Sequence, residues 1–381
     1  MIEAIQEEMI ASGVFAAGGM LLLDESGEEK ASEKSVGAAR QYNGRQGKVD
    51  LSQVGVYLTL ATGSRWSWVD GEIFIPEKWF EAAASQKRQK VGLPEERCFQ
   101  SKPELGWAMI QRAQARGLPF EAVACDTLYG RNPWLRDPCS GAGIECYSDV
   151  PSTTQVYLTE PVIGMPTAKQ ARQPRVLSPA PLSVTRVAAL PDTLWRRLRL
   201  RPDERGVLEA DFAARRVWTV RADLTVHQEW LLIRRQQHQM TYTLSNAPAN
   251  TPLTTLAARK SARYFAERSN QDAKSELGWD EFQATKFRAW EHHLALTILA
   301  SWFIAETKIE WEALTSRDPA LLEQYQVEVL PALSMANVRQ LLRAVLPLPQ
   351  LSPLQAAELV VKHLDNRTRS RKSRLRTRFR P

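Results

Sequence analysis

Short apolar runs, separated by glycine, proline and charged residues, dominate the first part of the chain. The runs at 20–24, 54–62 and 120–126 are mostly aliphatic, which is typical of strands buried inside a sheet. Residues 66–76 predict two short strands around an Asp-Gly turn or one strand with a bulge. Residues 104–117 follow a helical period and end in glycine, so they predict an amphipathic helix.

The pattern changes after residue 160. Residues 154–160 still predict a strand, but 165–184 are rich in proline, alanine and basic residues and predict a loop or linker. Between 190 and 250, β-branched and alternating positions predict three strands, and helical periods then continue to residue 365. Strands and helices that alternate around one sheet indicate an α/β fold, with the β-rich stretch as a separate lobe.

Positive charge is concentrated at the C-terminal end. The formal net charge is +7, yet residues 362–381 hold nine Lys or Arg and one Asp, a net of +8, which leaves −1 for the rest of the chain. An Arg-rich end with hardly any acids is expected to stay disordered until it meets a polyanion such as DNA. The alternative is a solubilising end without a partner. The candidate DNA contacts there are Arg371, Lys372, Arg374 and Arg376.

Cysteine spacing and hydropathy limit the classes of protein. The four cysteines, at 98, 125, 139 and 146, lack the two-residue gap of a zinc or redox motif, so we expect free thiols in a reducing compartment. The apolar run near the start follows several glutamates and no basic residue, unlike a signal peptide. The apolar helical run 294–305 is too short to cross a bilayer. We therefore predict a cytoplasmic protein without a membrane segment.

Two acidic residues follow buried strands. Asp24 closes the run at 20–24, and Asp126 closes the run at 120–126. If the two strands are neighbours that stop at one edge of a sheet, the two carboxylates repel each other unless a cation lies between them. Mg²⁺ prefers such oxygen ligands, and a third carboxylate from a helix would complete a two-metal site for phosphoryl transfer. The alternative is that each is an ordinary turn or cap residue.

Three charged residues share one stripe in the stretch RYFAERSNQDAK. On a helix, Arg263, Glu267 and Lys274 fall within about 40° of one another, since successive residues turn by about 100°. Such a stripe is either an ion-paired surface or part of a catalytic helix.

Several separated blocks, in this order, resemble a known family. They include LLLDESG, SVGAARQYNGRQGKVDLSQVGVYL, FEAVACDTLYGRNPWLR and RYFAERSNQDAKSELGWDEF. The blocks are similar to those of DDE-type transposases of bacterial insertion sequences, closest to the insertion sequence 701 family. The resemblance implies a ribonuclease H-like core whose acidic triad falls on Asp24, Asp126 and Glu267. These three residues would hold two Mg²⁺ or Mn²⁺ ions.

The family's signature helix reads Tyr, two residues, Arg, three residues, Glu, six residues, Lys. This chain has Lys260 at the place of the tyrosine, followed by Arg263, Glu267 and Lys274 at the expected intervals. The resemblance implies that Arg263 and Lys274, together with Lys260, contact DNA phosphates. It also implies that the β-rich stretch is an insertion domain within the core.

The resemblance divides the chain into five parts. We expect a short N-terminal helix, the first part of the ribonuclease H-like core, a β-rich insertion domain, the helical second part of the core and a basic tail, at 1–18, 19–160, 161–252, 253–361 and 362–381. Only 23 residues precede Asp24, whereas family members carry a longer helical segment there, which indicates either a copy shortened at its N-terminus or a misassigned start codon.

The function implied is that of a DNA transposase. It would cleave strands at transposon ends with Mg²⁺ and join the freed 3′-hydroxyl to target DNA, as a homo-oligomer on DNA in the cytoplasm, associated with the nucleoid. Two alternatives stay open. One is a truncated, catalytically silent copy that binds DNA and regulates or titrates a full-length transposase. The other is a host nuclease on the same fold.

Overall fold

The structure is a computed structural model of residues 1–381. It describes all of them except 17, 45–46, 64, 167–172, 204–205, 238, 316, 329, 331–332, 346–350 and 379–381, and it leaves out the side chains of 201–208, 363, 366–367 and 369–378. The chain forms two compact units, Met1–Pro331 and Ala332–Pro381. The second unit contains two described helices, α11 (Met335–Val345) and α12 (Pro353–Arg378).

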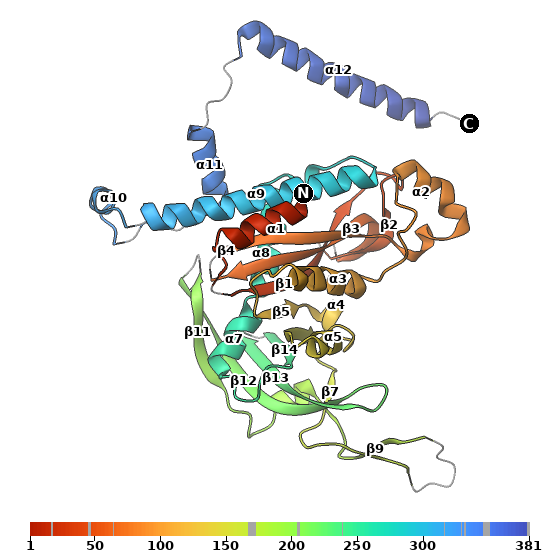
Figure 1. Cartoon of the computed structure of the whole chain (residues 1–381), viewed down its shortest axis with the longest axis vertical. Helices are drawn as coiled ribbons and strands as arrows, with labels where there is room; N and C mark the ends of the chain where they lie inside the picture. The colour runs from red at the N-terminus through yellow and green to blue at the C-terminus, as the bar shows by residue number, and fades with distance from the viewer. Residues whose placement is uncertain are drawn as a thin grey trace. The chain divides into compact units, whose positions relative to one another are not determined.

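A ten-stranded sheet forms the frame of the first unit (Figure 1). Its strands run in the order β11-β12-β13-β14-β6-β5-β1-β3-β2, and β4 also pairs with β3. Their bounds are β1 Met20–Glu29, β2 Ala39–Asn43, β3 Lys48–Thr62, β4 Arg65–Phe74, β5 Ala122–Cys125, β6 Glu145–Val150, β11 Arg196–Asp203, β12 Gly206–Val220, β13 Val226–Gln236 and β14 Gln239–Ser245. Two small hairpin-like sheets pair β7 (Gln155–Val156) with β10 (Leu182–Ser183) and β8 (Val162–Gly164) with β9 (Arg175–Ser178).

Ten described helices belong to this unit. They are α1 Ile2–Ala11, α2 Ser85–Val91, α3 Lys102–Ala115, α4 Thr127–Gly130, α5 Arg136–Gly141, α6 Val184–Ala188, α7 Leu253–Ser261, α8 Tyr264–Ser275, α9 Phe287–Leu314 and α10 Pro319–Tyr325. Short 3₁₀ turns lie at Glu77–Trp79, Ala82–Ala84 and Trp279–Glu281. The predicted amphipathic helix is α3. It begins with a capping box formed by Ser101 and Glu104. None of the helices described in the chain is long and apolar enough to cross a membrane.

The strand directions agree with a mixed α/β fold. β1 runs antiparallel to β3, and β3 runs antiparallel to β4. On the other side, β5 is parallel to β1 and β6 is parallel to β5. The order β4-β3-β1-β5-β6 is compatible with the ribonuclease H-like core that the sequence led us to expect.

The β-rich insertion extends this same sheet. β14 pairs with β6 in antiparallel register, and β13, β12 and β11 follow outward. The expectation of a separate lobe is therefore wrong for these strands, because backbone hydrogen bonds continue from the core into the insertion. The three strands predicted between 190 and 250 are present as β12, β13 and β14, whereas β11 was not predicted.

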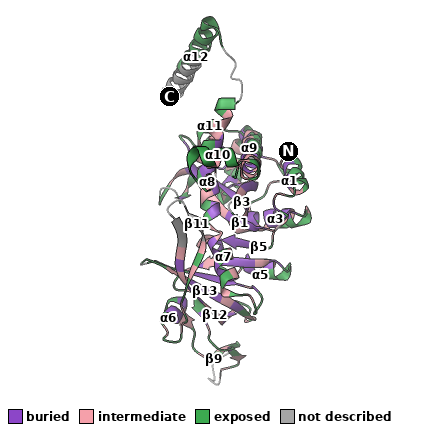
Figure 2. Ribbon diagram, turned by 90° about the vertical axis from the view of Figure 1, so that its left-hand side faces the viewer, coloured by how far each residue is buried: buried purple, intermediate pink, exposed green. Residues whose placement is uncertain are grey.

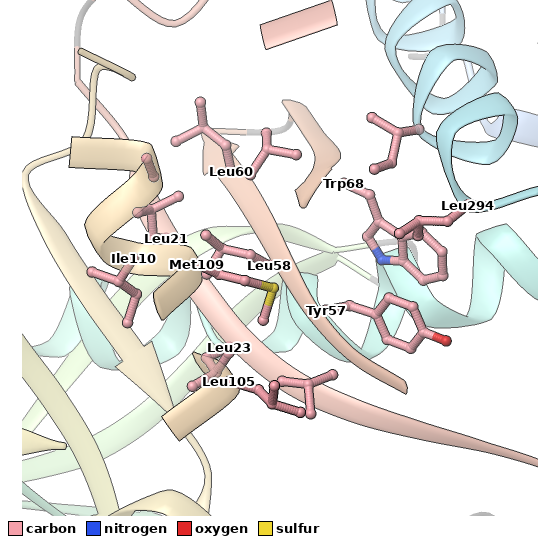
Figure 3. Close-up of a cluster of buried hydrophobic side chains, with 14 of the residues drawn as sticks. Leu21, Leu23, Tyr57, Leu58, Leu60, Trp68, Leu105, Met109, Ile110 and Leu294 are labelled. Atoms are coloured by element: carbon pink, nitrogen blue, oxygen red, sulfur yellow. The ribbon is translucent and has the colours of Figure 1, made fainter. Parts of the chain in front are cut away.

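Residues 20–23 of strand β1 are buried on both faces, and Figure 2 shows buried residues over much of the sheet. Figure 3 shows Leu21 and Leu23 packed against Leu105 and Met109 of α3. Their neighbours Met20 and Leu22 belong to another apolar cluster, which includes Leu256 of α7 and Phe265 of α8. Since alternate side chains point to opposite faces, the position of a residue on β1 decides whether it meets α3 or the α7–α8 pair.

Three predictions need correction. The strand at 20–24 does not end at Asp24 but continues to Glu29, because 25–29 pair with β3 despite their polar side chains. The strand predicted at 154–160 shrinks to Gln155–Val156. The basic tail is helical through Arg378 and not disordered, in keeping with the good helix propensity of Arg and Lys. The side chains of Arg371, Lys372, Arg374 and Arg376 lie outside the described part of the structure.

Candidate active site

Three carboxylates lie in one row across neighbouring parallel strands. Leu23 of β1 pairs with Cys125 of β5, which pairs in turn with Ser148 of β6. The residue after each of these is acidic: Asp24, Asp126 and Asp149. Neighbouring strands lie about 4.8 Å apart, so the three acidic residues follow one another across the sheet. We call Asp24, Asp126 and Asp149 the acid row.

The acid row points to the face of the sheet that α7 and α8 cover. Because side chains alternate along a strand, Asp24 lies on the same face of the sheet as Leu22, and Asp149 on the same face as Tyr147. Both Leu22 and Tyr147 belong to the apolar cluster on the face that α7 and α8 cover. Glu25 points the other way, toward α3, where its Oε2 lies 2.6 Å from Lys102 Nζ. Register and alternation thus bring the three acids to one side of the sheet.

Asp24 is held by the helix above it. Asn270 of α8 donates a hydrogen bond from Nδ2 to Asp24 Oδ2 at 3.1 Å, and the Trp68 indole donates to Asn270 Oδ1 at 3.1 Å. Burial raises the pKa of Asp24 to about 7. The negative charges of Asp126 and Glu267 also raise this pKa, whereas the positive charge of Arg263 lowers it. A buried carboxyl beside other carboxyls favours its neutral form.

Asp126 follows β5 directly and caps helix α4. Its Oδ1 accepts hydrogen bonds from the backbone N–H groups of Leu128 at 2.9 Å and Tyr129 at 3.4 Å. Burial raises the pKa of Asp126, although Arg263 and these two N–H groups act against it. The interpretation of Asp126 as a cap residue is therefore correct, and the cap also fixes its carboxylate beside Asp24.

The four residues of the signature lie on helices α7 and α8 and in the short turn between them. Arg263 lies between the two helices, and its Nη2 is 2.5 Å from Glu267 Oε1, while the Glu267 side chain remains 59% exposed. Lys274 Nζ lies 2.9 Å from Glu28 of β1. Lys260 Nζ lies 2.7 Å from Asp149 Oδ1. Each of the three predicted DNA-binding cations therefore has an acidic partner within the chain.

The Arg263 guanidinium interacts electrostatically with the acid row and with Glu267. Burial acts to lower the pKa of Arg263, but Asp149, Asp24, Glu267 and Asp126 together outweigh it and raise that pKa. The structure thus brings the three acids predicted from the sequence into electrostatic contact around Arg263.

Electrostatic contact is not yet a metal-binding arrangement. Over the described part of the chain, no three acidic, histidine or cysteine side chains are placed so that they could hold an ion. The donors are of the right kind, because carboxylate oxygens suit Mg²⁺. In this conformation, however, Glu267 is bonded to Arg263 instead of joining Asp24 and Asp126.

Two residues of the site were not found from the sequence. Asp149 lies in the strand ECYSDV, whose polar character hides it from a search for apolar runs. Asn270 lies three residues after Glu267, which places it on the same side of α8. A search for polar residues at helical spacing from Glu267 would have found Asn270.

A family model described as DDE superfamily endonuclease matches residues 4–206, more than half of the chain. The chain belongs to this family. The part of the chain that matches contains the acid row, whereas Glu267 lies beyond it.

The chain is also similar to a curated protein, the probable transposase for insertion sequence element IS701 of Microchaete diplosiphon. The identity is 29% over 113 residues, which cover 30% of this chain and 26% of that protein. The match thus spans about a quarter of the relative's length. Both comparisons confirm the resemblance to DDE-type insertion-sequence transposases.

Proposed function

We propose that this member of the DDE superfamily is a DNA transposase, which cleaves strands at transposon ends and joins the freed 3′-hydroxyl to target DNA. The observation that carries the proposal is the acid row, in register on parallel strands and covered by the helix that carries Glu267. We further propose that it acts as a homo-oligomer on DNA in the cytoplasm, associated with the nucleoid.

The residues proposed to hold Mg²⁺ or Mn²⁺ are Asp24, Asp126 and Glu267. Two bound ions would stabilise the attacking and leaving oxygens of an in-line displacement. Crowding of Asp24 and Asp126 supports the assignment, because burial and the second carboxylate raise the pKa of the first. Asn270 holds the Asp24 carboxylate in place, and Glu267 must turn away from Arg263 to join it.

The charged residues of the signature have different roles in this proposal. Arg263 and Lys274 would contact DNA phosphates after exchanging Glu267 and Glu28 for them. Lys260 is 6% exposed and bonded to Asp149, so we assign it to the interior of the site and not to DNA. The arginines and the lysine of the tail, 371, 372, 374 and 376, stay predictions for DNA contact.

The test is strand cleavage of a plasmid that carries the inverted repeats flanking the gene, with Mg²⁺ or Mn²⁺. The wild-type chain should nick at the repeat ends, and Asp126→Asn should not. Asp272→Asn is the matched control, because Asp272 is a buried acid on α8 that pairs with Arg268 at 3.2 Å, outside the acid row. Cleavage by Asp126→Asn at the wild-type rate would refute the proposal.

A second candidate is a catalytically silent DNA-binding copy that regulates or titrates an active transposase. The pairing of Glu267 with Arg263 favours it, since the described residues then present no three-donor group. The two candidates differ in one experiment. A silent copy would bind the inverted repeats in a gel-shift assay and leave them uncut at every Mg²⁺ and Mn²⁺ concentration.

A further inference from the structure

Asp149 belongs to the acid row, yet its oxygens are already in use. Oδ1 lies 2.7 Å from Lys260 Nζ and also accepts from the Thr243 hydroxyl of β14. Oδ2 lies 3.4 Å from Arg263 Nε. A carboxylate with both oxygens bonded to cations and a hydroxyl is a poor fourth ligand for an ion.

The contacts form a chain that ends at the third acid. Lys260 bonds Asp149, Asp149 bonds Arg263, and Arg263 bonds Glu267 at 2.5 Å. The inner end is buried, since the Lys260 side chain is 4% exposed, whereas the Glu267 side chain at the outer end is 59% exposed. The position of Arg263 is therefore set from the interior of the protein.

On the basis of the proposed function, we infer that Asp149 is a positioning residue of the active site: with Lys260 as its buried partner, it holds the Arg263 guanidinium beside Asp24, Asp126 and Glu267. Thr243, which pairs with Asp149 across β14 and β6, fixes the same carboxylate from the other strand. Lys260 at the place of the signature tyrosine thus supplies the charge that the partly buried Asp149 requires.

The negative charge of Asp149 explains why its buried partner, Lys260, must be a cation. Burial alone would raise the pKa of Asp149, but Lys260, Thr243 and Arg263 outweigh it and lower that pKa. Asp149 is thereby kept ionised and able to attract the guanidinium. Without it, the Arg263 charge would be shared only among the three proposed metal ligands and would compete with an incoming cation.

The test compares Asp149→Asn with the matched control Asp272→Asn. Asparagine still accepts bonds from Lys260 and Thr243 but no longer attracts Arg263. We expect Asp149→Asn to lower the cleavage rate at saturating DNA, and to raise the Kd for Mn²⁺ measured by calorimetry without DNA, by about 10- to 100-fold each, as for other groups that orient a site. Asp272→Asn should leave both close to wild type.

A double variant separates positioning from stability. Asp149→Asn alone leaves the Lys260 charge buried and should lower Tm, whereas adding Lys260→Met removes both charges and should restore much of it. Positioning requires that the double variant regain Tm but not the cleavage rate or the Mn²⁺ affinity.

The outcomes are distinct. The inference is overturned if Asp149→Asn matches Asp272→Asn in cleavage and Mn²⁺ affinity, or if the double variant cleaves like wild type. A wild-type chain that neither cleaves nor binds Mn²⁺ overturns the proposed function and removes the site that Asp149 would position. Weaker Mn²⁺ binding by Asp149→Asn in a chain that does not cleave supports the positioning role while refuting the transposase activity.

Discussion

Two clusters of charge, one partly buried and one buried, lie in the same sheet and have opposite electrostatic balance. In the acid row, burial raises the pKa of Asp24 to about 7 and Asp126 adds to the shift. In the insertion, Glu229 of β13 accepts from Arg136 Nε at 3.0 Å and Arg221 Nη1 at 3.2 Å. Burial acts to raise the pKa of Glu229 as well, but there the two arginines outweigh it and lower that pKa.

The difference is the one expected between a structural cluster and the proposed catalytic one. A carboxylate with two arginines is satisfied within the protein, and it ties α5 to the insertion strands. A carboxyl whose pKa is raised by burial and by neighbouring carboxylates has too little positive charge around it. A substrate or an ion can supply that charge. Perturbed carboxyls of this kind concentrate at functional sites, and their removal often increases stability.

The largest effect expected is on catalysis. Asp24→Asn should reduce strand cleavage by at least about 1,000-fold, because the loss of a metal ligand removes several kcal/mol of transition-state stabilisation and 1.36 kcal/mol corresponds to tenfold. Cleavage is measured on the plasmid with inverted repeats. Glu229→Gln, assayed below its unfolding transition, should still cleave. If both variants lose cleavage equally, the two clusters do not differ in function.

The next effect is on stability in the insertion. Glu229→Gln leaves two buried arginines without their carboxylate, and we expect it to lower the free energy of unfolding by about 3–5 kcal/mol. Urea unfolding followed by tryptophan fluorescence measures this. Arg197→Gln is the control, since Arg197 is 64% exposed and surface pairs contribute little. An unchanged midpoint for Glu229→Gln would show that the cluster is not structural.

The same measurement should give the opposite sign in the acid row. Because the folded-state pKa of Asp24 is about 7, above its ordinary value of 3.8, the carboxyl costs stability progressively as pH rises from 3.8 to 7. Metal-free Asp24→Asn should therefore equal wild type near pH 3.8 and exceed it above pH 7, by no more than about 4 kcal/mol at 1.36 kcal/mol per pKa unit. A variant less stable than wild type at pH 8 would contradict the raised pKa.

The smallest effect is expected at Ser101, and it serves as the reference for the other changes in unfolding free energy. Ser101 caps α3 and lies in neither cluster, so Ser101→Ala should lower the free energy of unfolding by about 1 kcal/mol at every pH and leave cleavage unchanged. Thermal unfolding from pH 5 to 8 measures this. A pH-dependent loss would show that the scan reports on more than the two clusters.

Much of this arrangement was predictable from local pattern. The aliphatic runs before Asp24 and Asp126 predicted β1 and β5, and the helical period predicted α3 and the helix of Glu267. What local pattern could not predict is pairing between distant segments. Residues 25–29 are polar, and they form a strand only because β3 lies beside them.

The same limit hid part of the site. Asp149 becomes a member of the acid row only through the register of β6 on β5, and its partner Lys260 comes from a helix far along the chain. The contact between Glu267 and Arg263 is local, one helical turn apart, so the sequence placed both on one stripe. It predicted an ion pair as one of two alternatives, and the structure has that pair between Arg263 and Glu267.

The pairing of β14 with β6 has a practical consequence for anyone who wishes to shorten the protein. β6 is an interior strand only because the insertion covers one of its edges. Excising the insertion would bare the main-chain donors and acceptors of the strand that carries Asp149, and bared strand edges recruit other chains into aggregates. A minimal version of this protein therefore has to keep β14, or replace it with another strand that seals the same edge.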